Sequence, residues 1–317
     1  MIKLLFTYVC FLLLLTGCKS TGSNKENYQS LPIEISPNNL LEHYQVLSSN
    51  AFQGRKVATQ GNLKAQQYII SQLKQFSVLP FKEKFTHSFD INSMFSTETG
   101  NNVIGIIKSS EKSVGYIVLT AHFDHLGIKG NKIYNGADDN ASGSAALLSI
   151  AEQLAKQPIN HDVIVLFTDA EENGLKGSKA FLKQNQHLMS EIKLNINMDM
   201  LAGSKNSKNL HFISRGIDKL IVKHKRQQFN QNHLYHELAI NKGFKRGRLS
   251  LDTRINWIKA SDHGVFHQHG IPFIYYGVGT HKNYHSQHDE FENTNHRLFI
   301  HATNAIYQQL LFLDQEI

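Results

Sequence analysis

The chain has 317 residues, 41% of them hydrophobic, and a formal net charge of +7. That length and apolar fraction can bury a large core as one α/β domain, and there is no internal repeat. The positive residues are scattered, with the tightest cluster between Lys242 and Arg248, and no nucleic-acid-binding motif accompanies them. Nucleic acid is therefore not an expected partner.

The N-terminal residues have the pattern of an export signal. Lys3 precedes an apolar stretch from Leu4 to Leu15 that is too short to span a bilayer stably. Leu15-Thr16-Gly17-Cys18 then resembles a bacterial lipobox, in which the cysteine carries diacylglycerol after cleavage. We expect a signal peptide at residues 1–17, and a lipidated Cys18 with a flexible tether at residues 18–36. The alternative is an ordinary secretory signal with an incidental cysteine.

Cleavage before Cys18 would place the protein in the cell envelope, attached to a membrane through that residue. Lys19 follows, rather than the Asp that commonly retains lipoproteins at an inner membrane, and this favours the outer membrane. Cys10 would leave with the signal, so no cysteine would remain for a disulfide or a thiolate ligand. A metal site would have to use nitrogen and oxygen atoms.

Hydrophobic periodicity predicts the order of the folded elements. Helices are expected at residues 38–48, 61–76 and 144–157, and strands at 83–91, 102–108, 114–121, 163–168 and 194–198. From residue 114 onward strands and helices alternate, and the strands are nearly continuous apolar runs. The pattern predicts a mostly parallel mixed central sheet with helices on both faces, in a single domain at residues 37–317.

Acidic and histidine residues follow three of these strands. His122 and Asp124 come after the strand that ends at Ala121, a glutamate pair follows the strand that ends at Thr168, and Asp199 follows Met198. Ligands gather outside the carboxyl ends of strands in open α/β sheets. We expect these segments to meet at one edge of the sheet.

Five short segments could together hold two metal ions. They are His122-Phe123-Asp124, Asp138-Asp139-Asn140, Glu171-Glu172, Asn197-Met198-Asp199 and Tyr284-His285. Neutral imidazole and carboxylate oxygen both suit a borderline cation such as zinc, and such a set is typical of a two-metal hydrolytic site. Taken alone, Asp138 or Asp139 could simply cap the following helix, and the glutamate pair could be a solvated acidic loop.

Position and charge suggest which of these residues bind metal and which accept protons. In an extended segment the side chains of His122 and Asp124 point to the same side. One of them can therefore bind a metal ion while the other accepts a hydrogen bond from the second imidazole N–H. Adjacent glutamates point in different directions, so one could ligate and the other accept a proton from water. Three carboxylates and one hydroxide would neutralise two divalent cations.

These segments resemble the M28 family of zinc aminopeptidases in order and spacing. The most similar stretches are Ala121-His122-Phe123-Asp124-His125-Leu126-Gly127, Ala170-Glu171-Glu172-Asn173-Gly174-Leu175-Lys176-Gly177-Ser178 and Ser261-Asp262-His263. Gly54-Arg55, followed by Gly61 and a helix, is also similar to the start of the family's domain. The resemblance extends from about residue 38 to the C-terminus.

The resemblance implies a role for each residue. The ligands of two zinc ions would be His122, Asp139, Glu172, Asp199 and His285, with Asp139 bridging the ions. Glu171 would be the general base, Tyr284 would polarise the scissile carbonyl or hold the oxyanion, and Asp124 would support His122. After His285 the chain departs from many relatives, which carry a Thr-Pro pair there, so His281 and His288 stay open as alternatives to His285.

The implied function is a metallo-aminopeptidase that removes N-terminal residues from peptides, with no obligate protein partner evident. One alternative on the same fold is a glutaminyl cyclase with a single zinc, although those enzymes typically carry Trp at the position of Tyr284. Another is a binding protein that has lost catalysis, although none of the ligands is missing here. Residues 233–254 match nothing in the family and are expected to form part of the substrate rim.

Overall fold

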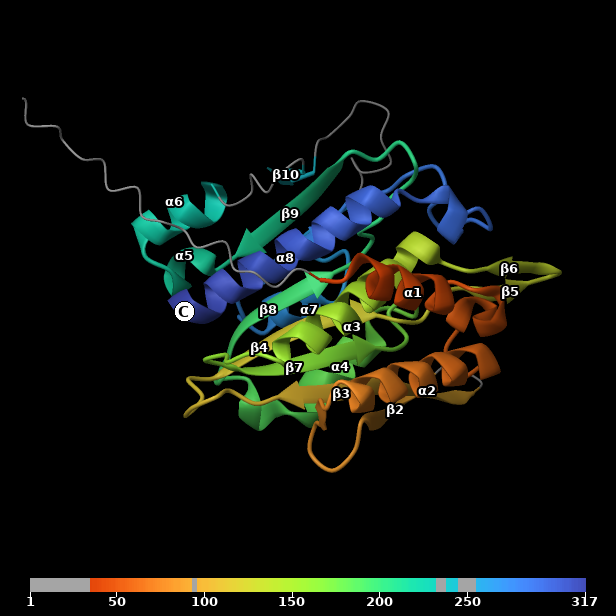
Figure 1. Ribbon diagram of the computed structural model, residues 1–317. Helices are drawn as coiled ribbons and strands as arrows, with labels where there is room; N and C mark the ends of the chain where they lie inside the picture. The colour runs from red at the N-terminus through yellow and green to blue at the C-terminus, as the bar shows by residue number, and fades with distance from the viewer. Residues whose placement is uncertain (1–34, 93–95, 232–237, 245–254) are drawn as a thin grey trace, which may run out of the picture. The chain divides into compact units, whose positions relative to one another are not determined.

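The computed structural model describes residues 35–92, 96–231, 238–244 and 255–317 (Figure 1). The predicted signal peptide, Cys18 and most of the predicted tether lie outside the described residues, as does most of the segment 233–254. Ile35, near the end of the predicted tether, is buried, and its amide N–H donates to Asn304 Oδ1 at 2.9 Å. The folded body therefore includes the last residues of that tether.

The helices and strands follow the predicted order. The helices are α1 (Pro37–Leu47), α2 (Gln60–Gln75), α3 (Gly143–Leu154), α4 (Lys176–Gln184), α5 (Ile217–Leu220), α6 (Lys223–Gln231), α7 (His263–Gln268) and α8 (His296–Glu316). The strands are β1 (Leu79–Pro80), β2 (Thr86–Asn92), β3 (Thr97–Ile107), β4 (Tyr116–His122), β5 (Gly127–Lys129), β6 (Lys132–Tyr134), β7 (Asp162–Thr168), β8 (Ile192–Met198), β9 (Asn209–Arg215), β10 (Ala239–Lys242) and β11 (Phe273–Gly277). β3 begins before its predicted start because its polar first residues pair with β2.

Among the described residues, nine strands form one sheet in the order β1-β3-β7-β4-β8-β11-β9-β10, with β2 paired to β3. The central strands β7, β4, β8 and β11 run parallel to one another, whereas β1, β2 and β3 form an antiparallel side. β9 is antiparallel to β11 and carries β10 in parallel. The predicted mixed, mostly parallel sheet in a single domain is confirmed.

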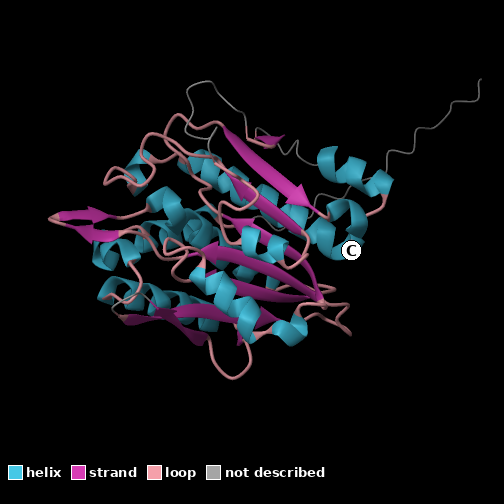
Figure 2. Ribbon diagram, turned by 180° about the vertical axis from the view of Figure 1, so that it is seen from behind, coloured by secondary structure: helices cyan, strands magenta, loops and turns pink. Residues whose placement is uncertain are grey.

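Helices cover both faces of the sheet, so its central strands are buried on both sides. Successive side chains of β7 alternate between two cores: Val163, Val165 and Phe167 join one, and Ile164 and Leu166 the other. Helices α1, α2, α3 and α8 pack on the first face (Figure 1), and α4 and α7 on the second, seen from behind in Figure 2. In the described part of the chain, no helix combines the length and apolar character needed to cross a membrane.

Candidate metal centre

The carboxyl ends of three parallel strands bring the predicted site residues together. His122 is the last residue of β4, Asp199 directly follows β8, and the glutamate pair lies in the turn after β7. Since β4 pairs in parallel with both β7 and β8, these ends meet at one edge of the sheet. Segments that lie far apart in the sequence thus share one site.

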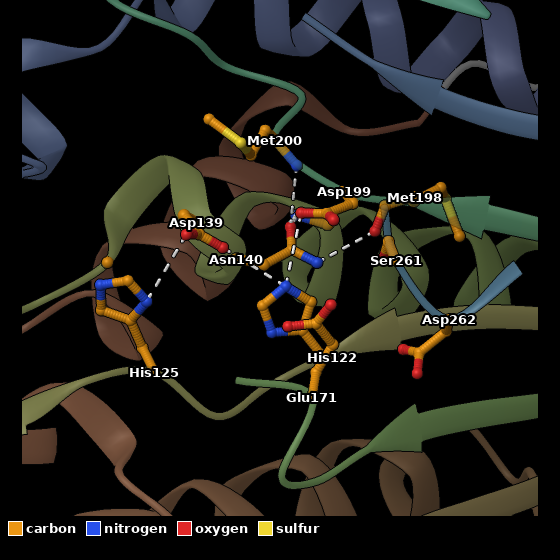
Figure 3. A network of polar contacts seen from close by, with 12 residues as sticks. His122, His125, Asp139, Asn140, Glu171, Met198, Asp199, Met200, Ser261 and Asp262 are labelled. Carbon is orange, nitrogen blue, oxygen red and sulfur yellow. Dashed lines mark hydrogen bonds and ion pairs between the residues drawn. The ribbon is translucent and has the colours of Figure 1, made fainter. Parts of the chain in front are cut away.

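The first group of side chains that could hold a metal ion consists of His122, Glu171 and Asp199, whose possible ligand atoms lie within 4.8 Å of one another. His122 Nε2 lies 3.4 Å from Asp199 Oδ1 and 3.3 Å from Asp139 Oδ1 (Figure 3). His122 and Asp199 are both almost completely buried. Asp139 therefore faces this group with one of its oxygens.

The second group consists of His125, Asp139 and Glu172, again with ligand atoms within 4.8 Å of one another. His285 approaches from a separate loop: its Nε2 lies 3.0 Å from Asp139 Oδ2 and 3.3 Å from Glu172 Oε2. The two oxygens of Asp139 thus face different groups. That is the arrangement that a ligand bridging two ions would need.

The backbone around Asp139 is held by side chains from distant parts of the chain. Asp289 accepts hydrogen bonds from the amides of Asp138 and Asp139 at 2.9 and 3.0 Å, one on each carboxylate oxygen. Asn140 donates to the carbonyl of Met198 and accepts from the amide of Gly143 at the start of α3. The turn Ala137–Ser142 is thereby tied both to α3 and to the end of β8.

Asp138 points away from both groups. Its Oδ1 accepts from the amides of Ala202 and Gly203, and its Oδ2 lies 2.9 Å from His281 Nε2. Asn140, rather than either aspartate, binds an amide at the N-terminus of α3. Asp138 therefore links the turn before α3 to the loops after β8 and β11.

Asp124 supports the turn that carries the glutamate pair. Its two carboxylate oxygens accept from the amides of Glu171 at 3.0 Å and Glu172 at 3.4 Å. His122 Nδ1 lies 3.2 Å from the main-chain oxygen of Asp124 and 3.7 Å from its Oδ1. One residue thus orients both the imidazole and the glutamate turn.

The three histidines of the loop after β11 have different surroundings. His285 faces the carboxylates of the second group, and its side chain is 37% exposed. His281 is paired with Asp138, and His288 is exposed and contacts Gln287. Tyr284 stacks on the His285 ring with centroids 3.9 Å apart. Of the three, His285 is the one whose ring lies at the second group.

A cavity of about 160 Å³ lies over the first group and is also lined by Asp139 and His285. Its lining combines the polar groups with an apolar wall: His122, Asp139, Glu171, Asp199, Met200, Ile255, Trp257, Ala260, Thr280, Tyr284 and His285. Glu171 and Tyr284 both reach this lining. A small molecule in the cavity would touch the carboxylates and the apolar wall at once.

Burial sets the charge state of the site. Burial raises the pKa of Glu171 well above its usual range, although the neighbouring His122 opposes the rise. Burial also acts on Asp139, but there the close His122 and His285 imidazoles dominate and hold its pKa well below the usual range.

The donor set fits zinc. The buried atoms of the two groups that have no hydrogen-bond partner among the described residues include His125 Nδ1, Asp139 Oδ2, Glu172 Oε1 and Asp199 Oδ1. Buried polar atoms are nearly always paired, and an ion is one of the few explanations when they are not. Imidazole nitrogens and carboxylate oxygens are zinc ligands, so cations at both groups would satisfy these atoms.

The sequence patterns did not identify two residues of this region. Alternation along an extended segment would set His125 on the side opposite His122 and Asp124, so this pattern gives no signal for His125, but β4 ends at His122 and the chain turns. Arg55 lies fully buried beneath the site and donates to the carbonyls of Phe123 and Gly136, among others. Its place in the Gly54-Arg55 motif was the available signal.

Comparisons with known proteins agree with this geometry. Aminopeptidase YwaD of Bacillus subtilis is 30% identical over 112 residues, which are 35% of this chain and 24% of that protein. Leucine aminopeptidase 2 of Trichophyton rubrum is 30% identical over 137 residues, 43% of this chain and 26% of that enzyme. The matched segments thus span about a quarter of these relatives' lengths.

Solved structures share the fold at low sequence identity. BSAP, a zinc aminopeptidase from Bacillus subtilis, superposes with a TM-score of 0.65 at 15% identity, over 87% of this chain and 94% of its own. A glutaminyl cyclase from Bacteroides thetaiotaomicron gives a TM-score of 0.66 at 18% identity, over 88% and 98%.

The family assignment rests on a longer match. Residues 102–310, which include all the segments of the two groups, match the sequence profile of peptidase family M28. With the two groups of metal-binding side chains at the carboxyl edge of the sheet, this match identifies the chain as a member of peptidase family M28 with an aminopeptidase-like fold.

Proposed function

We propose that this chain is an aminopeptidase that hydrolyses the N-terminal residue from peptides with two zinc ions. The observation that carries the proposal is the position of Asp139 between two groups of metal-binding side chains, with Glu171 beside the first. The ligands would be His122, Asp139, Glu172, Asp199 and His285. Asp139 would be shared by both ions.

Glu171 would be the general base. When bound, two zinc ions would acidify a shared water molecule and polarise the peptide carbonyl. Glu171 would accept the proton of the attacking water and return it to the departing amine. Its burial favours this role, because burial raises the pKa of Glu171 and a stronger base accepts the proton more readily.

Tyr284 would act on the carbonyl oxygen of the substrate. It lines the cavity, and its ring is held by stacking on His285. Burial and the surrounding carboxylates raise the pKa of Tyr284, so the phenol stays protonated and can donate a hydrogen bond as negative charge develops on that oxygen. The apolar wall formed by Met200, Ile255 and Trp257 would receive an apolar side chain of the N-terminal residue.

The replacement Glu171→Gln tests the proposed base. We expect turnover of aminoacyl amides to fall by about 10²–10⁴-fold, because the amide cannot accept the proton, while two zinc ions remain bound. Glu191→Gln, at an exposed position, is the matched control and should keep full activity. Activity that survives chelation of zinc contradicts the proposal, and loss of zinc in Glu171→Gln makes Glu171 a ligand instead.

A glutaminyl cyclase is the second candidate, because solved cyclases resemble this chain as closely in fold as the aminopeptidases do. Formation of pyroglutamate from an N-terminal glutaminyl peptide, with one zinc ion per chain, would favour this reaction. Release of free amino acids with two zinc ions per chain would favour the aminopeptidase.

We also propose that Cys18 anchors the protein to the cell envelope, with the outer membrane favoured, on the strength of the sequence Leu15-Thr16-Gly17-Cys18. Labelling with a radioactive fatty acid should mark the full-length protein and not its Cys18→Ser variant. Equal labelling of the two would contradict this proposal.

A further inference from the structure

His125 is a buried histidine that the five-ligand assignment leaves without a role. It is 1% exposed, and neither of its ring nitrogens forms a hydrogen bond with a described residue. Yet its Nδ1 lies 2.8 Å from Glu172 Oε1 and 3.8 Å from Asp139 Oδ2. A buried imidazole this close to two carboxylates needs an explanation.

The contact between His125 and Glu172 lacks the geometry of a hydrogen bond. Both His125 Nδ1 and Glu172 Oε1 remain without a hydrogen-bond partner although they are close together. Two ligands of one ion come close without bonding to each other, because zinc–ligand bonds of about 2.0–2.2 Å in a tetrahedral arrangement set ligand atoms about 3.3–3.6 Å apart. The distances from His125 Nδ1 to Glu172 Oε1 and Asp139 Oδ2, 2.8 and 3.8 Å, lie on either side of that range. The same pattern recurs at His285 Nε2 and Asp139 Oδ2, which lie 3.0 Å apart while Asp139 Oδ2 has no hydrogen-bond partner.

The ring of His125 is held in this position by its surroundings. A Cβ atom at Gly136 would lie 2.4 Å from the ring atoms Cδ2 and Cγ, so the backbone of Gly136 packs directly against the imidazole. Gly136 also has a φ of +56°, which disfavours a side chain there on its own account. Figure 3 shows His125 and His122 reaching Asp139 from different sides.

We propose that His125 is an additional ligand of the second ion, alongside Asp139, Glu172 and His285. This inference rests on the proposed two-zinc site. It makes the two ions unequal: the second would have four protein ligands, and the first only His122, Asp139 and Asp199. A fourth protein ligand leaves the second ion room for the shared water only as a fifth ligand, whereas an ion with three protein ligands keeps a position for water or substrate. The open position then lies in the group that contains Glu171.

Zinc titration of the metal-free protein tests this assignment through binding rather than activity. We expect two ions to bind the wild-type chain. In His125→Asn the dissociation constant of the ion at the second group should rise at least about 10–100-fold, while that of the other ion stays unchanged. Asparagine can donate a hydrogen bond to Glu172 but is a poor zinc ligand, so this variant separates the two roles. His187→Ala, at an exposed position, is the control and should match the wild type.

Second-ion binding in His125→Asn that equals the wild type overturns the assignment. If that variant fails to fold, zinc X-ray absorption of the wild-type protein decides: three imidazoles over two zinc ions support the proposal, and two contradict it. Failure of the proposed function has a different signature, namely a wild-type chain that binds a single ion or releases no amino acid. In that event the imidazole count at the bound zinc still decides the role of His125.

Discussion

The two halves of the site are held by different kinds of structure. In the strand-end half, His122, Glu171 and Asp199 extend from β4, β7 and β8 or follow them closely, and parallel pairing fixes the spacing of those ends. The loop half, which contains His125, Asp139, Glu172 and His285, is assembled largely from irregular segments. A sheet positions ligands through its own hydrogen bonds, whereas ligands on loops need separate supports.

Those supports are side chains that bond to distant backbone atoms. Asp289 binds the amides of Asp138 and Asp139 across about 150 residues. Arg55 binds the carbonyls of Asn135 and Gly136 across about 80 residues. The loop half therefore depends on residues that are not ligands and that lie far away in the sequence.

The replacement Arg55→Lys should have the largest effect on stability. The Arg55 guanidinium donates to the carbonyls of Leu47, Phe123, Asn135 and Gly136, and its pKa of about 10, lowered by burial, keeps it charged at neutral pH. The single ammonium of lysine cannot satisfy four carbonyls in this planar arrangement. We expect about 3 kcal/mol or more to be lost from the free energy of unfolding, because two or more buried carbonyls stay unpaired.

Urea denaturation of the metal-free protein measures this loss. Arg215→Lys, at an exposed position, is the control and should stay within about 0.5 kcal/mol of the wild type. If Arg55→Lys proves as stable as that control, the loop half does not depend on Arg55. The idea that distant side chains support the loop half would then be wrong for its main contact.

The same contrast explains what the sequence could predict. Apolar runs such as Val163 to Thr168 identify buried strands, and parallel strands must end together, so the strand-end half could be predicted from periodicity and order alone. The second strand pair, β5 and β6, was not predicted, because its three-residue strands are too short to show a period.

The loop half could not be derived in this way. Periodicity carries no information about a chain after a strand has ended, so the direction of the His125 side chain depends on contacts such as its packing against Gly136. Likewise, nothing local distinguishes His281, which binds Asp138, from His285, which lies at Asp139. The family resemblance suggested His285, whereas the contacts of His281 emerge only from the folded chain.

A substitution at Asp289 tests whether the two halves are independent. Its two oxygens hold the amides of Asp138 and Asp139, and Asp289→Asn leaves only one acceptor for the two donors. We expect the second zinc ion to bind about 10–100-fold more weakly at pH 7.5, because a ligand that loses its support binds less well. The first ion shares Asp139 but should change less, because its other ligands, His122 and Asp199, are placed by strand ends.

Sequential zinc titration of the metal-free protein measures both constants. Asp218→Asn, on the exposed surface of α5, is the matched control and should leave both unchanged. If Asp289→Asn weakens the binding of both ions equally, the two halves are energetically coupled, although different kinds of structure hold them.

The effect that is smallest at neutral pH concerns the strand-end half, where uncharged polar groups pack behind β8. His263 Nε2 lies 2.8 Å from the Trp257 carbonyl, to which it can donate, and its Nδ1 lies 3.4 Å from Asn197 Nδ2 on β8, near Asp199. Burial lowers the pKa of His263 to about 3, against about 6.5 in the unfolded chain. Between these values the unfolded state binds a proton that the folded state does not, so acid destabilises the fold by up to about 1.4 kcal/mol per pH unit.

The variant His263→Gln removes this proton while it keeps a donor for the Trp257 carbonyl. The free energy of unfolding of the wild type, minus that of the variant, should be constant above pH 7.5 and should decrease as the pH falls from 6.5 toward 4. Because the buried carboxylates titrate in both proteins, their contribution cancels in the difference. If the free energy of unfolding depends on pH in the same way in both proteins, His263 can take up a proton without unfolding the chain. The residues that pack behind β8 would then be no more rigid than the loops of the other half.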